Sequence, residues 1–95
     1  MKKSLIQNGR YCYVCGTENA LHKHHIFFGT ANRKIADEDG AYCYLCYLHH
    51  NGGNWGVHFN KELDLKLKRE CERAWLSAYN AEISDFIKRY GKNYL

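Results

Sequence analysis

The chain has 95 residues, of which 45% are hydrophobic, 15% aromatic and 25% charged. This length fits one small domain over residues 1–95 and excludes a separate cofactor-binding or regulatory unit. The aromatic content excludes a disordered chain, and the net charge of +4 permits a polyanionic partner without requiring one. A core of this size stabilises a fold weakly, so the 5 Cys and 6 His are candidates for a metal staple.

The N-terminal segment carries no targeting signal. Lys2 and Lys3 supply a basic start, but no apolar run follows them, so we do not expect secretion. No stretch reaches the ~20 apolar residues of a membrane span, so we expect no membrane partner. Because such a chain stays reduced and its cysteine count is odd, Cys-x-x-Cys pairs favour metal binding over a disulfide framework.

The first half of the chain, up to about residue 60, holds all six His and four of the five Cys. Its apolar runs are short, as is typical of strands and loops; they cover residues 11–14, 26–28 and 42–48. Cys12 and Cys15 form a Cys-x-x-Cys pair followed by Gly16. The chain reverses between the two thiolates, so both can bind one tetrahedral ion, and glycine relieves the backbone after the turn. This spacing predicts half of a zinc site.

The other half of the zinc site is expected within residues 43–50. Both Cys43 with Cys46 and Cys46 with His49 have the required spacing. We favour Cys46 with His49, because residues 42–45 have the pattern of an apolar strand in which Cys43 can be a small buried residue. A site with Cys43 stays open as the alternative. The predicted structural zinc ligands are Cys12, Cys15, Cys46 and His49.

The remaining histidines form a second candidate site. His24 and His25 are adjacent and precede an apolar pair. In a strand their side chains point to opposite faces, so one can bind a metal ion while the other acts as a base on a water molecule. His22 shares the face of His24, so it stays open as an alternative ligand, although we expect it at the surface. With His50 and His58, three imidazoles around one ion and a fourth as base would form an open hydrolytic site.

The second half of the chain, residues 61–95, is predicted to be helical. Apolar side chains recur there in steps of four with charged residues between them: Leu63, Leu67, Cys71, Trp75, Tyr79 and Ile83. Asn80 is expected to cap a second helix, and Gly91 is expected to end it. We expect these helices to cover the metal-rich half, with Cys71 in the core and most basic side chains in solvent.

The order of these motifs resembles that of small HNH endonucleases, the His-Me finger or ββα-metal nucleases, of the type common in bacteriophages and prophages of Gram-positive bacteria. The motifs lie in residues 11–60: Cys12-x-x-Cys15, Leu21-x-x-His24-His25-Ile26-Phe27, Leu45-Cys46-x-x-His49-His50-Asn51 and Val57-His58-Phe59-Asn60. The resemblance implies an α+β fold. A zinc-stapled two-stranded hairpin and a helix would form the ββα-metal core over residues 11–60, with a helical cover over residues 61–95.

The same resemblance implies hydrolysis of DNA phosphodiester bonds. His25 would be the general base, and His24, His50 and His58 would bind a divalent ion, Mg²⁺, Mn²⁺, Ni²⁺ or Zn²⁺, beside the structural Zn²⁺. DNA would be the partner, in the cytoplasm of a bacterial host, for a protein of phage or prophage origin that works as a homodimer or within larger phage DNA-processing machinery. The predicted phosphate contacts flank the motifs: Arg10, Lys23, Arg33 and Lys34.

One departure from the HNH pattern concerns its middle Asn. This chain has Gly40-Ala41-Tyr42 where the family has that Asn. A backbone carbonyl of this region could instead orient the base imidazole, and three other residues stay open as substitutes: Asn51, Asn54 and Asn60. The insertion at residues 52–54 also leaves open whether His50 and His58 reach one ion.

The alternative function is a non-catalytic zinc-finger module that binds DNA or a protein. It accounts for the Cys and Cys/His pairs equally well. It does not account for the further histidines, because a structural zinc site is closed at four ligands. A redox protein is not expected, since no βαβ pattern surrounds Cys12 and Cys15.

Overall fold

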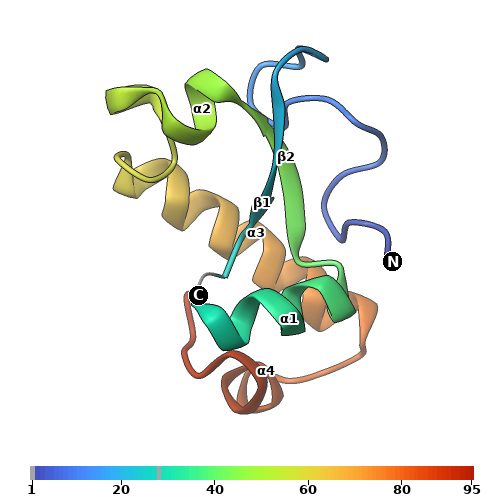
Figure 1. Ribbon diagram of the computed structural model, residues 1–95. Helices are drawn as coiled ribbons and strands as arrows, with labels where there is room; N and C mark the ends of the chain where they lie inside the picture. The colour runs from blue at the N-terminus through green and yellow to red at the C-terminus, as the bar shows by residue number, and fades with distance from the viewer. Residues whose placement is uncertain (1, 28) are drawn as a thin grey trace.

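The computed structural model describes residues 2–27 and 29–95. Its elements are β1 (Leu21–His25), α1 (Thr30–Asp39), β2 (Tyr42–Cys46), α2 (Tyr47–Asn51), the 3-10 helix η1 (Gly53–Trp55), α3 (Lys61–Ala78) and α4 (Ile83–Tyr90) (Figure 1). A two-stranded sheet combined with helices makes an α+β fold, as the sequence predicts. Phe28, the last residue of one predicted apolar run, lies outside the described residues.

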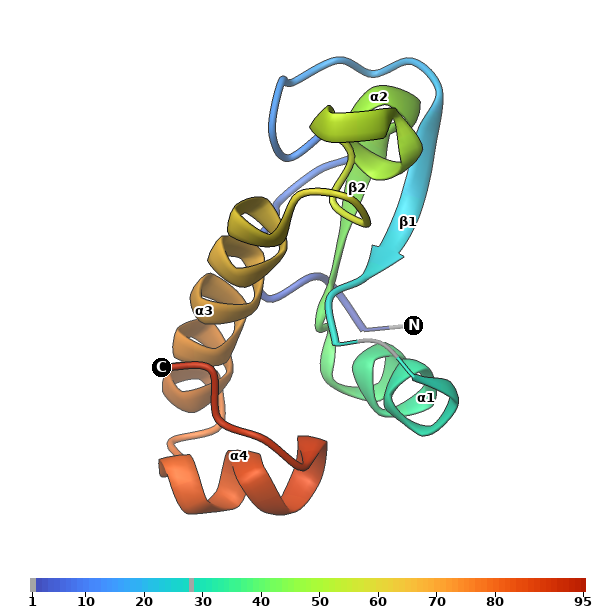
Figure 2. The ribbon, with the colours of Figure 1, turned by 90° about the vertical axis from the view of Figure 1, so that its left-hand side faces the viewer.

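The two strands pair antiparallel, with His24 opposite Cys43 and His25 opposite Tyr42. The chain between them forms α1, a helix that the sequence analysis did not predict. The helix ends at Gly40, which has a φ of 85° and donates its N–H to the carbonyl of Ala36. Figure 2 shows α3 running beside the sheet, with α2 at one end of the strands and α1 at the other. Each end of the sheet therefore lies beside a different helix.

Gly40 also receives the N-terminal segment. A Cβ built on Gly40 would lie 2.1 Å from the carbonyl oxygen of Lys3, so only glycine fits both the approach and the positive φ. Leu5 donates its N–H to the Gly40 carbonyl at 2.8 Å, and the side chain of Gln7 accepts the N–H of Tyr44 at 2.8 Å. The N-terminal segment therefore lines the outer edge of β2 and satisfies its backbone groups.

The helix predicted from residue 61 onwards is α3, which begins after Asn60. The side chain of Asn60 accepts the N–H of Leu63 at 3.1 Å, which caps the helix. The prediction that Asn80 caps the next helix is wrong, because Asn80 has a left-handed φ of 48°. Glu82 is the N-cap instead, in a reciprocal capping box with Asp85. Gly91 ends α4 in the left-handed conformation, as predicted.

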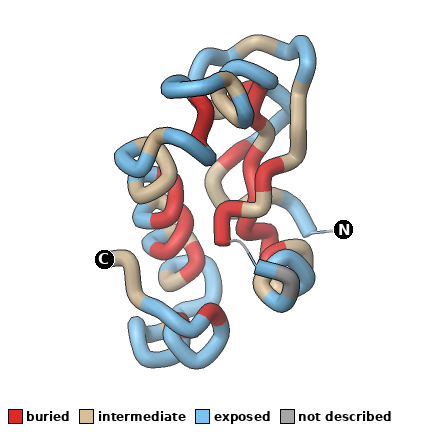
Figure 3. Tube along the Cα trace, turned by 60° about the vertical axis from the view of Figure 1, so that its left-hand side comes forward, coloured by how far each residue is buried: buried red, intermediate tan, exposed pale blue. Residues whose placement is uncertain are grey.

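The buried core lies between the sheet and the C-terminal helices, where buried segments of β2 and α3 face each other (Figure 3). Phe27, just after β1, packs its ring 5.1 Å from that of Phe86 and 4.6 Å from that of Tyr90. Cys71 is fully buried on α3, as predicted. Within residues 2–27 and 29–95, no helix combines the length and apolar character needed to cross a bilayer.

Candidate functional site

The first site is a cluster of three cysteines and one histidine. Cys12 and Cys15 lie in the loop before β1, Cys46 ends β2, and His49 lies in α2. Their ligand atoms all lie within 4.8 Å of one another. The Nδ1 of His49 is 3.3 Å from the Sγ of Cys46 and 3.7 Å from that of Cys12. Three thiols and an imidazole match a tetrahedral zinc site, so these residues could hold a zinc ion.

Backbone hydrogen bonds hold the cysteine loop against β2. Tyr13 donates its N–H to the carbonyl of Tyr44, and Gly16 donates its N–H to the carbonyl of Cys12, each at 2.8 Å. Gly16 has a φ of 82°, which explains why glycine follows the Cys-x-x-Cys pair. The local fold therefore turns both thiols of the loop toward the end of β2.

The alternative ligand Cys43 lies elsewhere. Its side chain is fully buried, and burial raises the pKa of the Cys43 thiol to about 12, so it stays protonated. Burial alone would also raise the pKa of Cys12, but hydrogen bonds from the backbone of Cys46, Cys15 and Val14 outweigh burial and lower it to about 6. The thiolate is the form that binds metal, and the ligand atoms that lie together are those of Cys12, Cys15, Cys46 and His49, not that of Cys43, so the set with His49 is the better zinc site.

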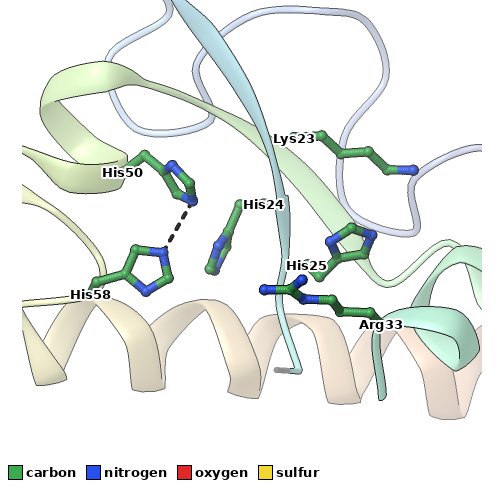
Figure 4. Close-up of a pocket in the computed structure, with 6 residues that line it drawn as sticks. All are labelled: Lys23, His24, His25, Arg33, His50 and His58. Atoms are coloured by element: carbon green, nitrogen blue, oxygen red, sulfur yellow. Dashed lines mark hydrogen bonds between the residues drawn. The ribbon is translucent and has the colours of Figure 1, made fainter. Parts of the chain in front are cut away.

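The second site is a cluster of three histidines: His24 from β1, His50 from α2 and His58 from the loop before α3. Their ligand atoms also lie within 4.8 Å of one another. The Nε2 atoms of His50 and His58 are 3.1 Å apart, and the ring of His24 lies 5.3 Å and 5.5 Å from theirs (Figure 4). The insertion before His58 does not separate it from His50, because Val57 donates its N–H to the carbonyl of His49 and folds the loop back.

Burial favours the neutral form of two members of this cluster, His24 and His50. His24 is only 2% exposed, and burial together with the neighbouring His50 and His58 lowers its pKa to about 3. Burial, followed by His58 and His22, lowers the pKa of His50 to about 4. Neutral imidazole is the form that binds metal. Because the ligand atoms of the three imidazoles lie close together, they could hold a divalent ion and leave positions open for water or substrate.

His25 lies on the opposite side of β1 from His24, as strand alternation predicts (Figure 4). Its Nε2 is 3.0 Å from Oδ1 of Asp37, and the Nζ of Lys23 is 2.6 Å from the same oxygen. The hydrogen bond from Lys23 and that from His25 lower the pKa of Asp37. Asp37 belongs to α1. Because this helix was not predicted, no sequence pattern indicated that Asp37 lies beside His25.

A pocket of about 330 Å³ joins His25 to the three-histidine cluster. Its lining consists of six residues: Lys23, His24, His25, Arg33, His50 and His58 (Figure 4). Two of the four predicted phosphate contacts, Lys23 and Arg33, are therefore at the pocket. The pocket joins the candidate base, the candidate ion ligands and positive charge in one place.

The other two predicted phosphate contacts, Arg10 and Lys34, lie away from this pocket. Arg10 belongs to the segment along the outer edge of β2, where its guanidinium lies 5.2 Å from the centre of the Tyr44 ring. Lys34 is exposed on α1, but consecutive helical residues are about 100° apart, so its neighbour Arg33 lines the pocket and Lys34 does not. For these two residues the structure does not support a shared site with His25.

His22 and the candidate substitutes for the middle Asn also have defined contacts. His22 is half-buried with its Nδ1 2.9 Å from that of His50, so the expectation of a surface residue is wrong. The folding of α2 over β1 brings them together. Asn60 caps α3, its Nδ2 is 3.5 Å from the Asn54 carbonyl, and the Nδ2 of Asn51 lies 3.1 Å from Nδ1 of His50. None of these contacts involves His25.

Comparison with known proteins gives no relative from which a function could be transferred. No protein-family model, curated protein or solved structure matches the chain. The features that bear on function are therefore the geometry of the two clusters and the pocket at the histidine cluster.

Proposed function

We propose that this chain is a metal-dependent endonuclease of the HNH type, which hydrolyses phosphodiester bonds of DNA. The observation that carries the proposal is the pocket in which His25 borders the cluster of His24, His50 and His58. A zinc-binding module alone needs only the Cys/His cluster. A second, open set of imidazoles with a further imidazole beside it fits hydrolysis.

The arrangement of elements supports the ββα-metal, or His-Me finger, form of this proposal. Strand β1 supplies His24 and His25, β2 pairs with it, and α2 follows β2 directly and supplies His50. The Cys/His cluster ties the start of α2 to the loop before β1. In this proposal the structural zinc holds α2 at the angle that aims His50 at the pocket.

The proposed chemistry assigns a separate task to each group. His24, His50 and His58 would hold a divalent cation, Mg²⁺, Mn²⁺, Ni²⁺ or Zn²⁺, which stabilises negative charge on the phosphate and the leaving 3′ oxygen. His25, as neutral imidazole, takes a proton from the water whose oxygen forms the new bond to phosphorus, while the bond to the 3′ oxygen breaks. Arg33 at the rim of the pocket offers a charge-assisted hydrogen bond to the DNA backbone.

A plasmid-nicking assay tests this proposal. Supercoiled DNA is incubated with purified zinc-loaded protein in Mg²⁺, Mn²⁺, Ni²⁺ or Zn²⁺, with an EDTA control. We expect wild-type protein to nick the plasmid with at least one ion, and His25→Ala to nick about 10²–10⁴-fold more slowly with unchanged folding and zinc content. Lys88→Ala, which removes an exposed charge on α4 away from the pocket, serves as the control that keeps activity.

Two outcomes would overturn the proposal. Absence of cleavage with every ion, from protein that is folded and zinc-loaded, would favour the non-catalytic module that binds DNA or a protein. Cleavage by His25→Ala at the wild-type rate would remove His25 as the base.

A further inference from the structure

A histidine that acts as a base needs one nitrogen free to accept a proton and a partner that fixes the other. The backbone carbonyls expected to do this for His25 already accept other hydrogen bonds. The carbonyl of Gly40 accepts from Leu5, and that of Ala41 accepts from the N–H of Ile26 at 3.1 Å. The carbonyl of Tyr42 accepts from the hydroxyl of Ser4. In the described part of the chain, the hydrogen bond of the His25 ring goes to a side chain instead.

The side chain that contacts His25 is the carboxylate of Asp37, with its Oδ1 3.0 Å from Nε2. An ionised carboxylate only accepts hydrogen bonds, so Nε2 of His25 carries the hydrogen and Nδ1 keeps its lone pair. Lys23 lies two residues before His25 on the same face of β1, and its Nζ is 2.6 Å from the same carboxylate oxygen. Oδ1 of Asp37 therefore contacts both the ammonium group of Lys23 and the imidazole of His25.

We propose that Asp37 is the positioning residue of His25, which selects the tautomer with hydrogen on Nε2 and directs Nδ1 to the water. The proposal rests on the nuclease function proposed above, in which His25 is the base. It assigns to α1, the helix inserted between the strands, the task that the HNH pattern gives to its middle Asn. Lys23 supports the carboxylate and is a second positioning residue behind it.

The exposure of this contact makes it testable. The side chain of Asp37 is 46% exposed, and ion pairs at such positions contribute little to folding stability. Asp37→Ala is therefore expected to fold and to bind zinc like the wild type. Glu38→Ala, the neighbouring position on α1, provides the matched control, because Glu38 contacts Arg89 at 3.2 Å.

The first measurement is the tautomer of His25, read from the ¹⁵N chemical shifts of its ring in zinc-loaded protein without DNA. We expect the tautomer with hydrogen on Nε2 in the wild type, in Asp37→Asn, whose amide oxygen still accepts, and in Glu38→Ala. Asp37→Ala is expected to give a mixture of tautomers. A wild-type ring with hydrogen on Nδ1, or an unchanged tautomer in Asp37→Ala, would overturn the proposal whether or not the protein cleaves DNA.

The second measurement is the single-turnover cleavage rate at saturating DNA, together with the Kd for DNA. Asp37→Ala is expected to lower the rate about 10- to 100-fold with an unchanged Kd, while Asp37→Asn keeps most of the rate. A shifted tautomer without loss of rate would overturn the positioning role. If the wild type cleaves nothing, the nuclease proposal fails by itself, and the tautomer measurement still decides whether Asp37 fixes His25.

Discussion

The indole Nε1 of Trp75 donates a hydrogen bond to Oδ2 of Asp39 at 2.9 Å, which joins the last turn of α3 to the end of α1. The same oxygen accepts from the hydroxyl of Tyr90 at 2.9 Å and from Nε of Arg89 at 2.6 Å. Asp39 is only 6% exposed. One buried carboxylate therefore ties three helices together, and its charge is compensated by a guanidinium and two neutral donors.

This carboxylate should make stability depend on pH. Burial by itself would raise the pKa of Asp39, but hydrogen bonds from Arg89, Trp75 and Tyr90 outweigh burial and lower it. A lowered pKa means that the stabilisation is present above the unfolded value of about 3.9 and is lost as the pH falls through the folded value. We expect Asp39→Asn to reduce the free energy of unfolding by about 3 kcal/mol at pH 7, and by less at pH 3, which is below the unfolded pKa.

Urea unfolding at the two pH values measures this difference. Glu38→Gln, the adjacent and exposed position that pairs with the same Arg89, should change the free energy by less than about 0.5 kcal/mol. If Asp39→Asn lowered the free energy of unfolding equally at pH 7 and pH 3, the proposed link between stability and the protonation of Asp39 would be contradicted.

The Cys/His cluster predicts different results for two buried cysteines, Cys12 and Cys43. Cys12→Ser removes a ligand of the Cys/His cluster, so the protein should lose bound zinc and melt at a much lower temperature, because zinc binding contributes to folding. Cys43→Ser places a hydroxyl in a buried position and should cost about 1–3 kcal/mol while one zinc per chain is retained. Elemental analysis and thermal melting check both, and loss of zinc from Cys43→Ser alone would move the site to Cys43.

The three-histidine cluster predicts a second, separable ion site. His50→Ala should weaken binding of Mn²⁺ or Ni²⁺ by at least about 10-fold, a loss that outer-shell partners already cause, with zinc retained. Titration calorimetry on zinc-loaded protein measures the affinity. Leu48→Ala is the control, because Leu48 lies in the same short helix and is 48% exposed. An unchanged affinity in His50→Ala would exclude this cluster as the ion site.

The cap of α3 predicts a modest stability change. Asn60→Ala removes the acceptor for the N–H of Leu63 and should reduce the free energy of unfolding by about 1 kcal/mol. Asn60→Asp keeps the acceptor and places a negative charge at the helix N-terminus, so it should match or exceed the wild type. Equal destabilisation by both substitutions in urea unfolding would show that the cap is not the cause.

Long amphipathic helices and ligand spacing were the parts of this molecule that could be predicted. The steps of four from Leu63 to Trp75 identify α3, and Gly91 marks the end of α4. The same pattern continues to Tyr79 and Ile83, which lie beyond the end of α3, so the predicted helix was too long. In contrast, α1 is short and has few apolar residues, and its N-cap is Gly29, which has no side chain to accept a hydrogen bond, so its sequence contains no N-terminal cap signal. Asp37 was missed together with this helix. The N-cap of α4 was assigned wrongly because its capping box uses two acidic residues, Glu82 and Asp85.

The contacts of the sites depended on long-range folding. The sequence spacing predicted that Cys12 pairs with Cys15 and that Cys46 pairs with His49. The contact between His58 and His50 could not be predicted in this way, because it depends on how the loop before His58 folds back. The contact of His22 with His50 likewise depends on how α2 packs over β1. Sequence separation alone carries no information on such contacts.

The adjacency of His49 and His50 in α2 has a thermodynamic consequence. His49 belongs to the Cys/His cluster, and the next residue of α2, His50, belongs to the three-histidine cluster. An ion that shifted one of these two side chains would therefore also move the other. Such linkage is reciprocal: occupancy at one cluster would change affinity at the other by the same factor in both directions. If Co²⁺ replaced zinc in the Cys/His cluster, its absorption spectrum would then change when an ion binds to the three-histidine cluster.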